Sequence, residues 1–359
     1  MKIVIVTGGT GGHIYPALSF AHLIKDRYPQ ADLLFIGNKE RMESTLIPNE
    51  GYPFVGLSTQ SINGNIIQKA FRYLQVFSTR SEASQILNDF KPDWVVGFGG
   101  YVCVPVIMEA HKLKIPTFLH EQNAIAGKAN KFLAKKVTGI IASYPKNLED
   151  FPKDKTKLLG NPRSYDIKRY KDKSILNSLG LNAQLKTVLF VMGSLGAESL
   201  FASASSVLES LAQNQIQSIF VTGKKHYDAF IEKNDETSLI KIVPYIDQLK
   251  AMQEVDLMVT RGGATTAAEI TVLGVPSIII PSPYVPNNHQ FYNAQELYEA
   301  KGCEIVEEKD LDATTLVHQI MNILMNDKYR QSLSENALKM GHPQAAEEMF
   351  DYILSVLKK

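Results

Sequence analysis

Two matching series of strand-like segments constrain the fold of this chain most strongly. Each series opens with an apolar run, a glycine-rich turn and an amphipathic stretch: IVIVTGGTGGHIYPALSFAHLI near the N-terminus and TVLFVMGSLGAESLFASASSVL in the second half. Short apolar runs and helix-period segments alternate after both openings. Such alternation predicts parallel sheets covered by helices. We therefore expect an α/β protein with two Rossmann-like domains facing each other across a cleft, with ligands at the carboxyl ends of the strands.

The expected domain boundary lies in the stretch LGNPRSYDIKRYKDK, where a Gly-Asn-Pro sequence interrupts the pattern and charged residues follow. Each series holds about six strand-like runs, and two such series are too many for one compact sheet. We expect one domain over residues 1–160 and another over residues 164–341. The helical segment at 342–359 is expected to fold back onto the first domain.

Composition limits the protein classes to which the chain can belong. The formal net charge of +1 excludes a uniformly basic nucleic-acid binder. Residues 1–160 carry 19 Lys and Arg against 13 Asp and Glu, whereas residues 161–359 carry 19 against 24. The basic half indicates an anionic ligand or surface there, or simply an evenly solvated face.

Two other features of the sequence concern its compartment. The two cysteines lie far apart, at Cys103 and Cys303, and provide neither a disulfide framework nor a metal site. The chain starts directly with a strand-like run, and no apolar run reaches the ~18–20 residues of a membrane span. The sequence therefore predicts a cytosolic protein whose membrane contact, if it has one, is peripheral.

The first glycine-rich loop, at residues 8–12, lies between a strand and a helix and has the features of a phosphate site. It lacks the third glycine of the dinucleotide fingerprint, and no acid directly follows the next strand, so an NAD site is disfavoured. His13 falls in the first helical turn, where the positive helix end favours the neutral imidazole that a general base requires. A histidine that only caps or packs the helix start is the alternative.

Polar segments at other strand ends are further candidates. The run His120–Asn123 follows an apolar strand, and four consecutive polar residues at a carboxyl edge indicate a site. The segment ATTAAE, which ends at Glu269, is predicted to be helical. The Glu269 carboxylate could accept hydrogen bonds from a ribose diol, and the alternative is that it only interacts with the helix dipole. Ser194 lies in a second glycine loop, residues 193–197. This loop either binds another phosphate group or is only a tight turn between a strand and a helix. A long polar loop precedes Gln290, as is typical of functional loops.

The segment 63–87 combines an apolar stripe with basic side chains. Ile67, Phe71 and Leu74 follow helical spacing, and Lys69 lies on a flanking face. A helix of this kind docks on an anionic membrane surface. An ordinary helix that faces a protein core has the same pattern, so both interpretations stay open.

A set of motifs carries a family resemblance. In chain order, GGTGGHIYPA, GFGGYVCVP, HEQNAIAGKANK, GNPR, GSLGA, RGGATTAAE and NNHQFYNA resemble the MurG-type peptidoglycan N-acetylglucosaminyltransferases, and they run from residue 8 to residue 294. The resemblance implies the GT-B fold, no metal and no cofactor. It implies inverting transfer of GlcNAc from UDP-GlcNAc to the 4-hydroxyl of undecaprenyl-pyrophosphoryl-MurNAc-pentapeptide (lipid I), which gives lipid II.

The resemblance also implies where the protein acts and which of its residues bind the substrates or handle the proton. The expected location is peripheral, on an anionic surface at the cytoplasmic face of the plasma membrane, with further partners among cell-wall synthesis or division proteins and none among nucleic acids. His13 is implied as the base or an acceptor-binding group, and Glu121 is a second candidate for handling the proton. The implied substrate contacts are Thr10, Gly11 and Gly12 (donor sugar and acceptor pyrophosphate), Asn123 (GlcNAc), Arg163 and Ser194 (UDP phosphates), Ile246 (uracil), Ala264, Thr265 and Thr266 (phosphates), Glu269 (ribose) and Gln290 (sugar hydroxyls).

Three other functions fit parts of the pattern. A UDP-sugar epimerase of similar two-domain fold needs no lipid acceptor. A dinucleotide-dependent oxidoreductase is disfavoured by the broken glycine fingerprint. A non-catalytic sugar-nucleotide-binding protein needs the loops but no base.

Overall fold

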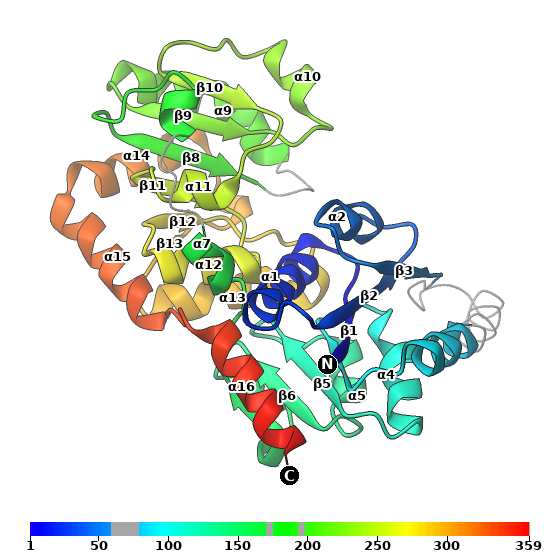
Figure 1. Ribbon diagram of the computed structural model, residues 1–359. Coiled ribbons are helices and arrows are strands. Elements are labelled where there is room, and N and C mark those ends of the chain that lie inside the picture. Colours follow the sequence, from blue (N-terminus) through cyan, green and yellow to red (C-terminus); the bar gives the residue numbers. More distant parts are fainter. Residues whose placement is uncertain (59–78, 170–174, 193–197, 359) are drawn as a thin grey trace, which may run out of the picture. The chain divides into compact units, whose positions relative to one another are not determined.

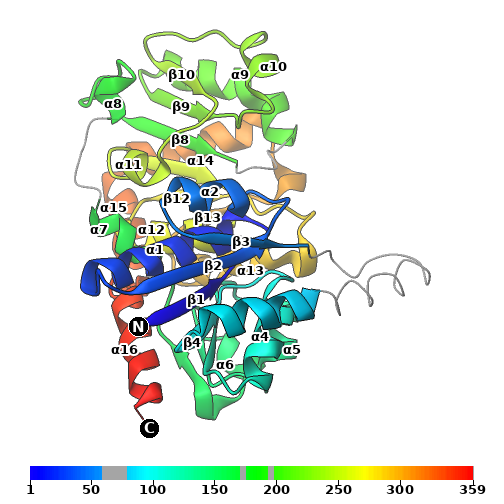
Figure 2. The same ribbon diagram turned by 45° about the vertical axis from the view of Figure 1, so that its right-hand side comes forward.

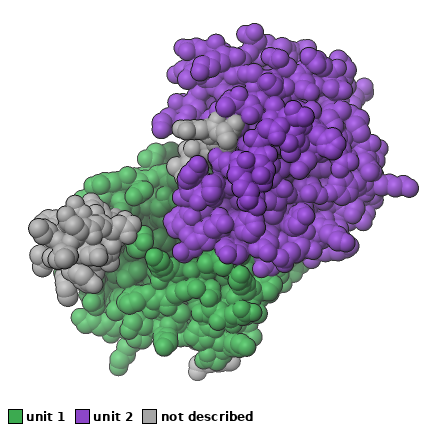
Figure 3. Space-filling model, turned by 180° about the vertical axis from the view of Figure 1, so that it is seen from behind, with its two compact units in different colours: residues 1–166, 342–359 green, residues 167–341 purple. Residues whose placement is uncertain are grey.

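A computed structural model describes residues 1–58, 79–169, 175–192 and 198–358 of the chain. These residues form two compact α/β units, residues 1–166 with 342–359 and residues 167–341 (Figures 1 and 3). Each unit has its own parallel sheet, which confirms the predicted pair of parallel-sheet α/β domains. The terminal segment from His342 belongs to the first unit.

The first unit is built on a parallel sheet of seven strands in the order β3-β2-β1-β4-β5-β6-β7. Their bounds are β1 Lys2–Val6, β2 Asp32–Asn38, β3 Phe54–Leu57, β4 Trp94–Gly97, β5 Thr117–Glu121, β6 Gly139–Ala142 and β7 Thr156–Leu158. The strand order changes direction between β1 and β4, which pair in parallel. In such sheets ligands bind outside the carboxyl ends of the strands at this switch point.

Helices cover both faces of this sheet. They are α1 Gly11–Arg27, α2 Glu43–Asn49, α4 Cys103–Lys112, α5 Lys128–Leu133, α6 Asn147–Asp150 and α16 Ala345–Leu357, and residues 79–90 are also helical. On one face α16 packs beside α1 (Figure 2), where the rings of Phe20 and Phe350 lie 6.2 Å apart. The strands β1 and β4 are buried on both faces, which explains their continuous apolar sequences.

The second unit repeats this topology with six parallel strands in the order β10-β9-β8-β11-β12-β13. The strands are β8 Thr187–Val191, β9 Gln217–Val221, β10 Ile240–Val243, β11 Leu257–Thr260, β12 Ser277–Ile279 and β13 Glu304–Ile305. The helices are α7 Ser164–Arg169, which begins in the first unit, α8 Ile175–Ser178, α9 Glu198–Gln213, α10 Tyr227–Ile231, α11 Gln248–Met252, α12 Ala264–Leu273, α13 His289–Glu299, α14 Ala313–Met325 and α15 Asp327–Met340. Here the switch point lies between β8 and β11.

One strand of the first unit was not expected from the sequence. Strand β3 lies at the edge of the sheet and pairs only with β2 among the described strands. Three of its four residues are half-buried and one is Gly56, so it lacks the apolar run that marks the central strands. Most of the proposed amphipathic segment, residues 63–78, lies outside the described residues. Within the described ranges, no helix is long and apolar enough to cross a membrane.

Candidate functional site

The first glycine-rich loop lies at the switch point of the first unit. It connects β1 to α1, which begins at Gly11 with Thr10 in the extended conformation of an N-cap. Gly11 and Gly12 therefore occupy the first two positions of a 17-residue helix, and His13 the third. Because N–H groups at the start of a helix attract anions, this end of α1 suits a phosphate.

The His13 ring is held in one tautomer by the same loop. Its Nδ1 lies 2.8 Å from the carbonyl oxygen of Gly8. A carbonyl only accepts hydrogen bonds, so Nδ1 carries the hydrogen and donates it. In the neutral ring the lone pair is then on Nε2, the atom that can take a proton from a substrate hydroxyl.

The GFGG motif at the end of β4 forms another glycine-containing loop, which packs directly on the first glycine-rich loop. Gly99 and Gly100 both have positive φ, +102° and +86°. A Cβ on Gly99 would lie 2.8 Å from the Cδ2 of His13, and one on Gly100 would lie 2.4 Å from the oxygen of Gly8. Side chains are thus excluded at both positions by the backbone conformation and by the closeness of the ring and the loop.

At the end of β5, the carboxylate of Glu121 is buried under the loop that follows. It accepts hydrogen bonds from the backbone nitrogens of Asn123 (3.0 Å) and Gly127 (2.9 Å) and from the side-chain amide of Asn130 (2.9 Å). Burial raises the pKa of Glu121, and these hydrogen bonds partly oppose that rise. Glu121 therefore organises the loop that presents Asn123.

The neighbouring His120 is completely buried. Its Nε2 lies 3.2 Å from the carbonyl oxygen of Gly160 and 3.2 Å from the Oγ of Ser143. Burial lowers the pKa of His120 to about 4, with the Gly160 hydrogen bond opposing and the charge of His13 adding to the decrease. The HEQN motif thus supplies buried side chains, His120 and Glu121 among them, that shape this end of the sheet.

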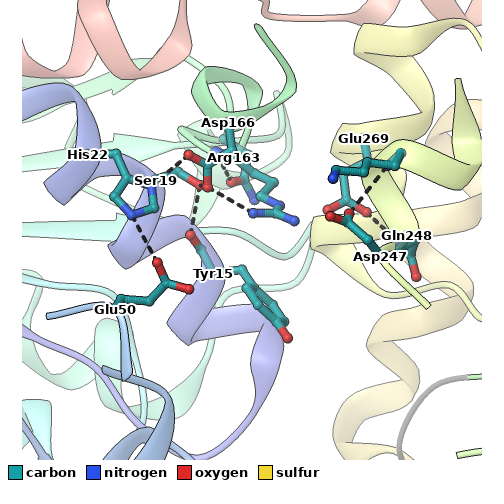
Figure 4. A network of polar contacts seen from close by, with 11 residues as sticks. Tyr15, Ser19, His22, Glu50, Arg163, Asp166, Asp247, Gln248 and Glu269 are labelled. Atoms are coloured by element: carbon teal, nitrogen blue, oxygen red, sulfur yellow. Dashed lines mark hydrogen bonds and ion pairs between the residues drawn. The ribbon is translucent and has the colours of Figure 1, made fainter. Parts of the chain in front are cut away.

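Arg163 is part of a polar network at the start of α7 (Figure 4). Its guanidinium lies 2.9 Å from Asp166 Oδ2 and over the ring of Tyr15, 4.9 Å from the ring centre. Asp166 is buried and also accepts hydrogen bonds from Ser19 Oγ (2.6 Å) and His22 Nδ1 (2.7 Å). These contacts fix the direction of the Arg163 side chain.

The Asp166 carboxylate is the centre of this network, and sequence reasoning missed it. Burial tends to raise its pKa, but hydrogen bonds from His22 and Ser19 and the charges of His22 and Arg163 bring the net pKa below its ordinary value. Ser19 lies 147 residues and His22 144 residues away in sequence. No local pattern could have indicated these partners.

In the second unit, the start of α12 follows β11 at the switch point. Gly263 is the N-cap, and Ala264, Thr265 and Thr266 begin the helix. A Cβ on Gly262 would lie 2.2 Å from the carbonyl oxygen of Gln290, so α13 packs directly on this turn. The amide of Asn293 donates to the Gly262 carbonyl at 3.0 Å.

Gln290 and Ile246 are the other predicted contacts in this unit. The side-chain oxygen of Gln290 accepts a hydrogen bond from the backbone nitrogen of Ser282 at 2.9 Å, which orients its amide. Ile246 is buried and directly precedes Asp247, the N-cap of α11. Ser194 lies outside the described residues.

Glu269 lies in α12 with its carboxylate buried. The side-chain amide of Gln248 donates to its Oε2 at 2.5 Å and lies 3.4 Å from Thr266 Oγ1 (Figure 4). Gln248, the first residue of α11, was not predicted as a site residue. Within the part of the chain that the structure describes, no group of three or more His, Cys, Asp or Glu residues is placed to hold a metal ion.

Family models and curated relatives of this chain agree on one family. The glycosyltransferase family 28 N-terminal domain matches residues 3–142, and the C-terminal domain of the same family matches residues 187–349. A relative from Pediococcus pentosaceus is 38% identical over 363 residues, covering 100% of both chains, and one from Listeria monocytogenes is 38% identical over 366 residues with the same coverage. Both are named UDP-N-acetylglucosamine--N-acetylmuramyl-(pentapeptide) pyrophosphoryl-undecaprenol N-acetylglucosamine transferase.

Solved structures with the same fold include members of more than one enzyme class. The chain is similar to MurG of Acinetobacter baumannii with a TM-score of 0.76 and 25% identity, covering 99% of this chain and 100% of that one. It is also similar to a putative UDP-N-acetylglucosamine 2-epimerase from Listeria monocytogenes, with a TM-score of 0.74, 12% identity and coverage of 98% and 94%. At that identity the epimerase shares the fold alone.

Proposed function

The chain belongs to glycosyltransferase family 28, and from this membership we propose that it transfers GlcNAc from UDP-GlcNAc to the 4-hydroxyl of lipid I, forming lipid II with inversion at the anomeric carbon. The observation that carries the proposal is the 38% identity, over the full length of both chains, with relatives named for that transfer. Epimerases share the fold at much lower identity, so the fold does not distinguish them.

The reaction needs a base for the attacking hydroxyl, and His13 is the proposed base. As the hydroxyl oxygen bonds to the anomeric carbon, its proton passes to Nε2 of His13, and the bond from that carbon to the UDP phosphate breaks with its electron pair leaving on UDP. The hydrogen bond from Nδ1 to the Gly8 carbonyl supports this role, because it keeps the lone pair of the neutral ring on Nε2. Glu121 remains the second candidate for the proton.

The departing diphosphate needs positive groups around it. We assign this role to the start of α12, at Ala264, Thr265 and Thr266, together with Arg163 and Ser194. The start of α1, at Thr10, Gly11 and Gly12, is assigned to the donor sugar and the acceptor pyrophosphate. Removing one such hydrogen-bond donor typically lowers turnover by about 10²–10³-fold.

The remaining proposed contacts select the donor. They are Ile246 with uracil, Glu269 with the ribose hydroxyls, and Asn123 and Gln290 with the GlcNAc hydroxyls. The buried position of Glu269 and the hydrogen bond from Ser282 to Gln290 support these assignments, because each side chain is held in one orientation.

We place the reaction at the cytoplasmic face of the plasma membrane, with the protein bound peripherally to an anionic surface. The support is the basic excess of residues 1–160, which carry 19 Lys and Arg against 13 Asp and Glu. The segment 63–87 is the proposed docking element, and Phe71→Glu should reduce binding to anionic liposomes without changing activity on a soluble acceptor. Other cell-wall or division proteins are further proposed partners.

One assay separates this function from its alternatives. The protein is incubated with radiolabelled UDP-GlcNAc, with and without a soluble lipid I analogue, and the label is followed in lipid and nucleotide fractions. We expect transfer of label to the analogue and no epimerised UDP-sugar in either reaction. Release of epimerised UDP-sugar without transfer would contradict the proposal, and so would donor binding with neither reaction.

A further inference from the structure

The carboxylate of Glu43 is buried directly beneath the first glycine loop. Glu43 is the first residue of α2 and is completely buried. There is room for the Glu43 side chain because Gly8 of the loop and Gly37 of β2 lack side chains: a Cβ on Gly8 would lie 2.6 Å from Glu43 Oε1, and one on Gly37 would lie 2.8 Å from its Cγ.

Glu43 is joined to His13 through a single peptide group. Its Oε1 accepts hydrogen bonds from the backbone nitrogens of Gly9 (3.2 Å) and Asn38 (3.0 Å). The Gly9 N–H and the Gly8 carbonyl belong to the same peptide group. That carbonyl accepts the hydrogen bond from His13 Nδ1 at 2.8 Å. The chain of hydrogen bonds therefore runs from the imidazole through the peptide to the carboxylate.

Hydrogen bonds in such a chain polarise one another. A carboxylate that accepts from a peptide N–H increases the negative charge on the carbonyl oxygen of the same peptide. A more negative carbonyl holds the Nδ1–H more strongly and stabilises the imidazolium that forms when Nε2 takes a proton. The aspartate of a Ser-His-Asp triad has this effect by direct contact, whereas here a peptide lies between carboxylate and ring.

We propose that Glu43 is a positioning residue for catalysis, which acts through the Gly8–Gly9 peptide to orient His13 and to stabilise its protonated form. This inference rests on the proposed role of His13 as the base. The positive end of α1 disfavours the imidazolium, and Glu43 opposes that effect. His120, on β5, also interacts electrostatically with the ring, and burial lowers the pKa of His120 to about 4, so it is neutral at neutral pH.

The conservative variant Glu43→Gln separates charge from shape. Within the residues that the structure describes, the Oε2 of Glu43 is buried without a hydrogen-bond partner. A glutamine can therefore keep its oxygen on the nitrogens of Gly9 and Asn38 and place its NH₂ group where Oε2 lies, so that the negative charge is lost while both hydrogen bonds remain. Glu109→Gln is the matched control, since Glu109 is a buried glutamate of the same unit that pairs with Arg80 instead.

The first measurement is the titration of the His13 ring by NMR in the protein without substrates. We expect Glu43→Gln to lower the midpoint by about one pH unit, as the loss of a nearby charge predicts, and Glu109→Gln to leave it unchanged. In the wild type, the Gly9 amide proton should shift with the same midpoint as the ring. An unshifted midpoint in Glu43→Gln, or no co-titration of Gly9 in the wild type, overturns the inference.

The second measurement is the transfer reaction itself. For Glu43→Gln we expect kcat to fall by about tenfold, KM for both substrates to stay within about twofold, and the acidic limb of the pH–rate profile to move to lower pH. In a His13→Ala background the same substitution should cause no further loss, and an additive loss overturns the inference. If the His13 midpoint shifts in a protein that performs no transfer, the proposed function fails while the coupling stands.

Discussion

Gln248 Nε2 lies 2.5 Å from Glu269 Oε2, so the first residue of α11 holds the buried carboxylate of α12. The same amide lies 3.4 Å from Thr266 Oγ1, one turn nearer the start of α12. The proposed function assigns the ribose hydroxyls to Glu269, and the hydrogen bond from Gln248 helps to orient the accepting oxygens. We therefore predict that Gln248 affects donor binding without contacting the donor itself.

We expect Gln248→Leu to raise KM for UDP-GlcNAc by about 5- to 30-fold, with kcat within about threefold, because a buried carboxylate that loses one hydrogen bond costs about 1–2 kcal/mol. Steady-state kinetics and calorimetric titration with UDP measure the change. Gln331→Leu is the control, since Gln331 makes the corresponding hydrogen bond to Glu335 on an exposed helix surface. Equal donor affinity in both variants would show that Gln248 does not orient Glu269.

Asp166→Asn tests the network that orients Arg163. At pH 7 the free energy of unfolding should fall by about 2–4 kcal/mol, because a buried carboxylate with charged partners is replaced by a neutral amide. Burial raises the pKa of Asp166, but hydrogen bonds and charges of its partners lower it to a net value below the ordinary 3.8. The stability from ionised Asp166 is therefore fully present above pH 3.8 and is lost as the pH falls through the lower folded pKa.

The corresponding measurement is urea denaturation at neutral pH and at several values below pH 4. The difference between wild type and Asp166→Asn should be largest at pH 7 and should shrink in acid. Asp351→Asn, which removes an exposed ion pair to Arg27, should leave the neutral-pH curve unchanged. A constant difference across the pH range would mean that the charge of Asp166 is not what stabilises the network.

Glu121→Gln is expected to damage the loop that presents Asn123. Each carboxylate oxygen accepts from N–H groups: Oε1 from Asn123 and Oε2 from Gly127 and Asn130. A glutamine has one accepting oxygen, so its NH₂ group must face a donor on one side, at a cost of about 2–4 kcal/mol in stability. Thermal unfolding and KM for UDP-GlcNAc should both change. A loss confined to kcat would instead assign the proton transfer to Glu121.

His13→Ala should lower kcat by about 10²–10⁴-fold while the affinity for UDP stays within about twofold, as expected for loss of a general base. Added imidazole should restore part of the rate. The control is His318→Ala, on an exposed position of α14. Near-normal turnover of His13→Ala would eliminate this residue as the base.

The sheets could be predicted from the sequence because the central strands are buried on both faces, which requires continuous apolar runs. Strand β3 could not, because an edge strand with Gly56 and half-buried neighbours needs no such run. The strands at both switch points are continuous apolar runs in the sequence. The glycine loops at the carboxyl ends of these strands can therefore be predicted as candidate sites.

The supporting contacts of the site could not be predicted, for a different physical reason. Glu43 meets Gly9 across 34 residues, and Ser19 meets Asp166 across 147. The first pair forms only when β1 and β2 bring the segments that follow them together, and the second only when α1 and α7 come into contact. Neither Glu43 nor Ser19 lies in a local sequence pattern that indicates its partner. The residues that hold His13 and Arg163 in place are therefore visible in the structure alone.

Gly99→Ala tests whether the position of the His13 ring matters for the reaction. The new Cβ would lie 2.8 Å from Cδ2 and 2.9 Å from Nε2 of His13, so the ring must move. Misplacing a catalytic group by about 1 Å typically costs on the order of 10²-fold in rate, and we expect kcat to fall by at least that much.

The positive φ of Gly99 means that an alanine there also loses stability through backbone strain. An alanine at a second glycine with positive φ measures this loss separately. Gly51 also has positive φ, +82°, and a Cβ there would meet no atom of the described residues within 4 Å. Both alanine variants should lose about 1–2 kcal/mol of stability through backbone strain, measured by thermal unfolding, but only Gly99→Ala should lose turnover at saturating substrate. If both variants keep wild-type kcat despite the lost stability, the ring tolerates displacement, and catalysis does not depend on where the loop after β4 holds His13.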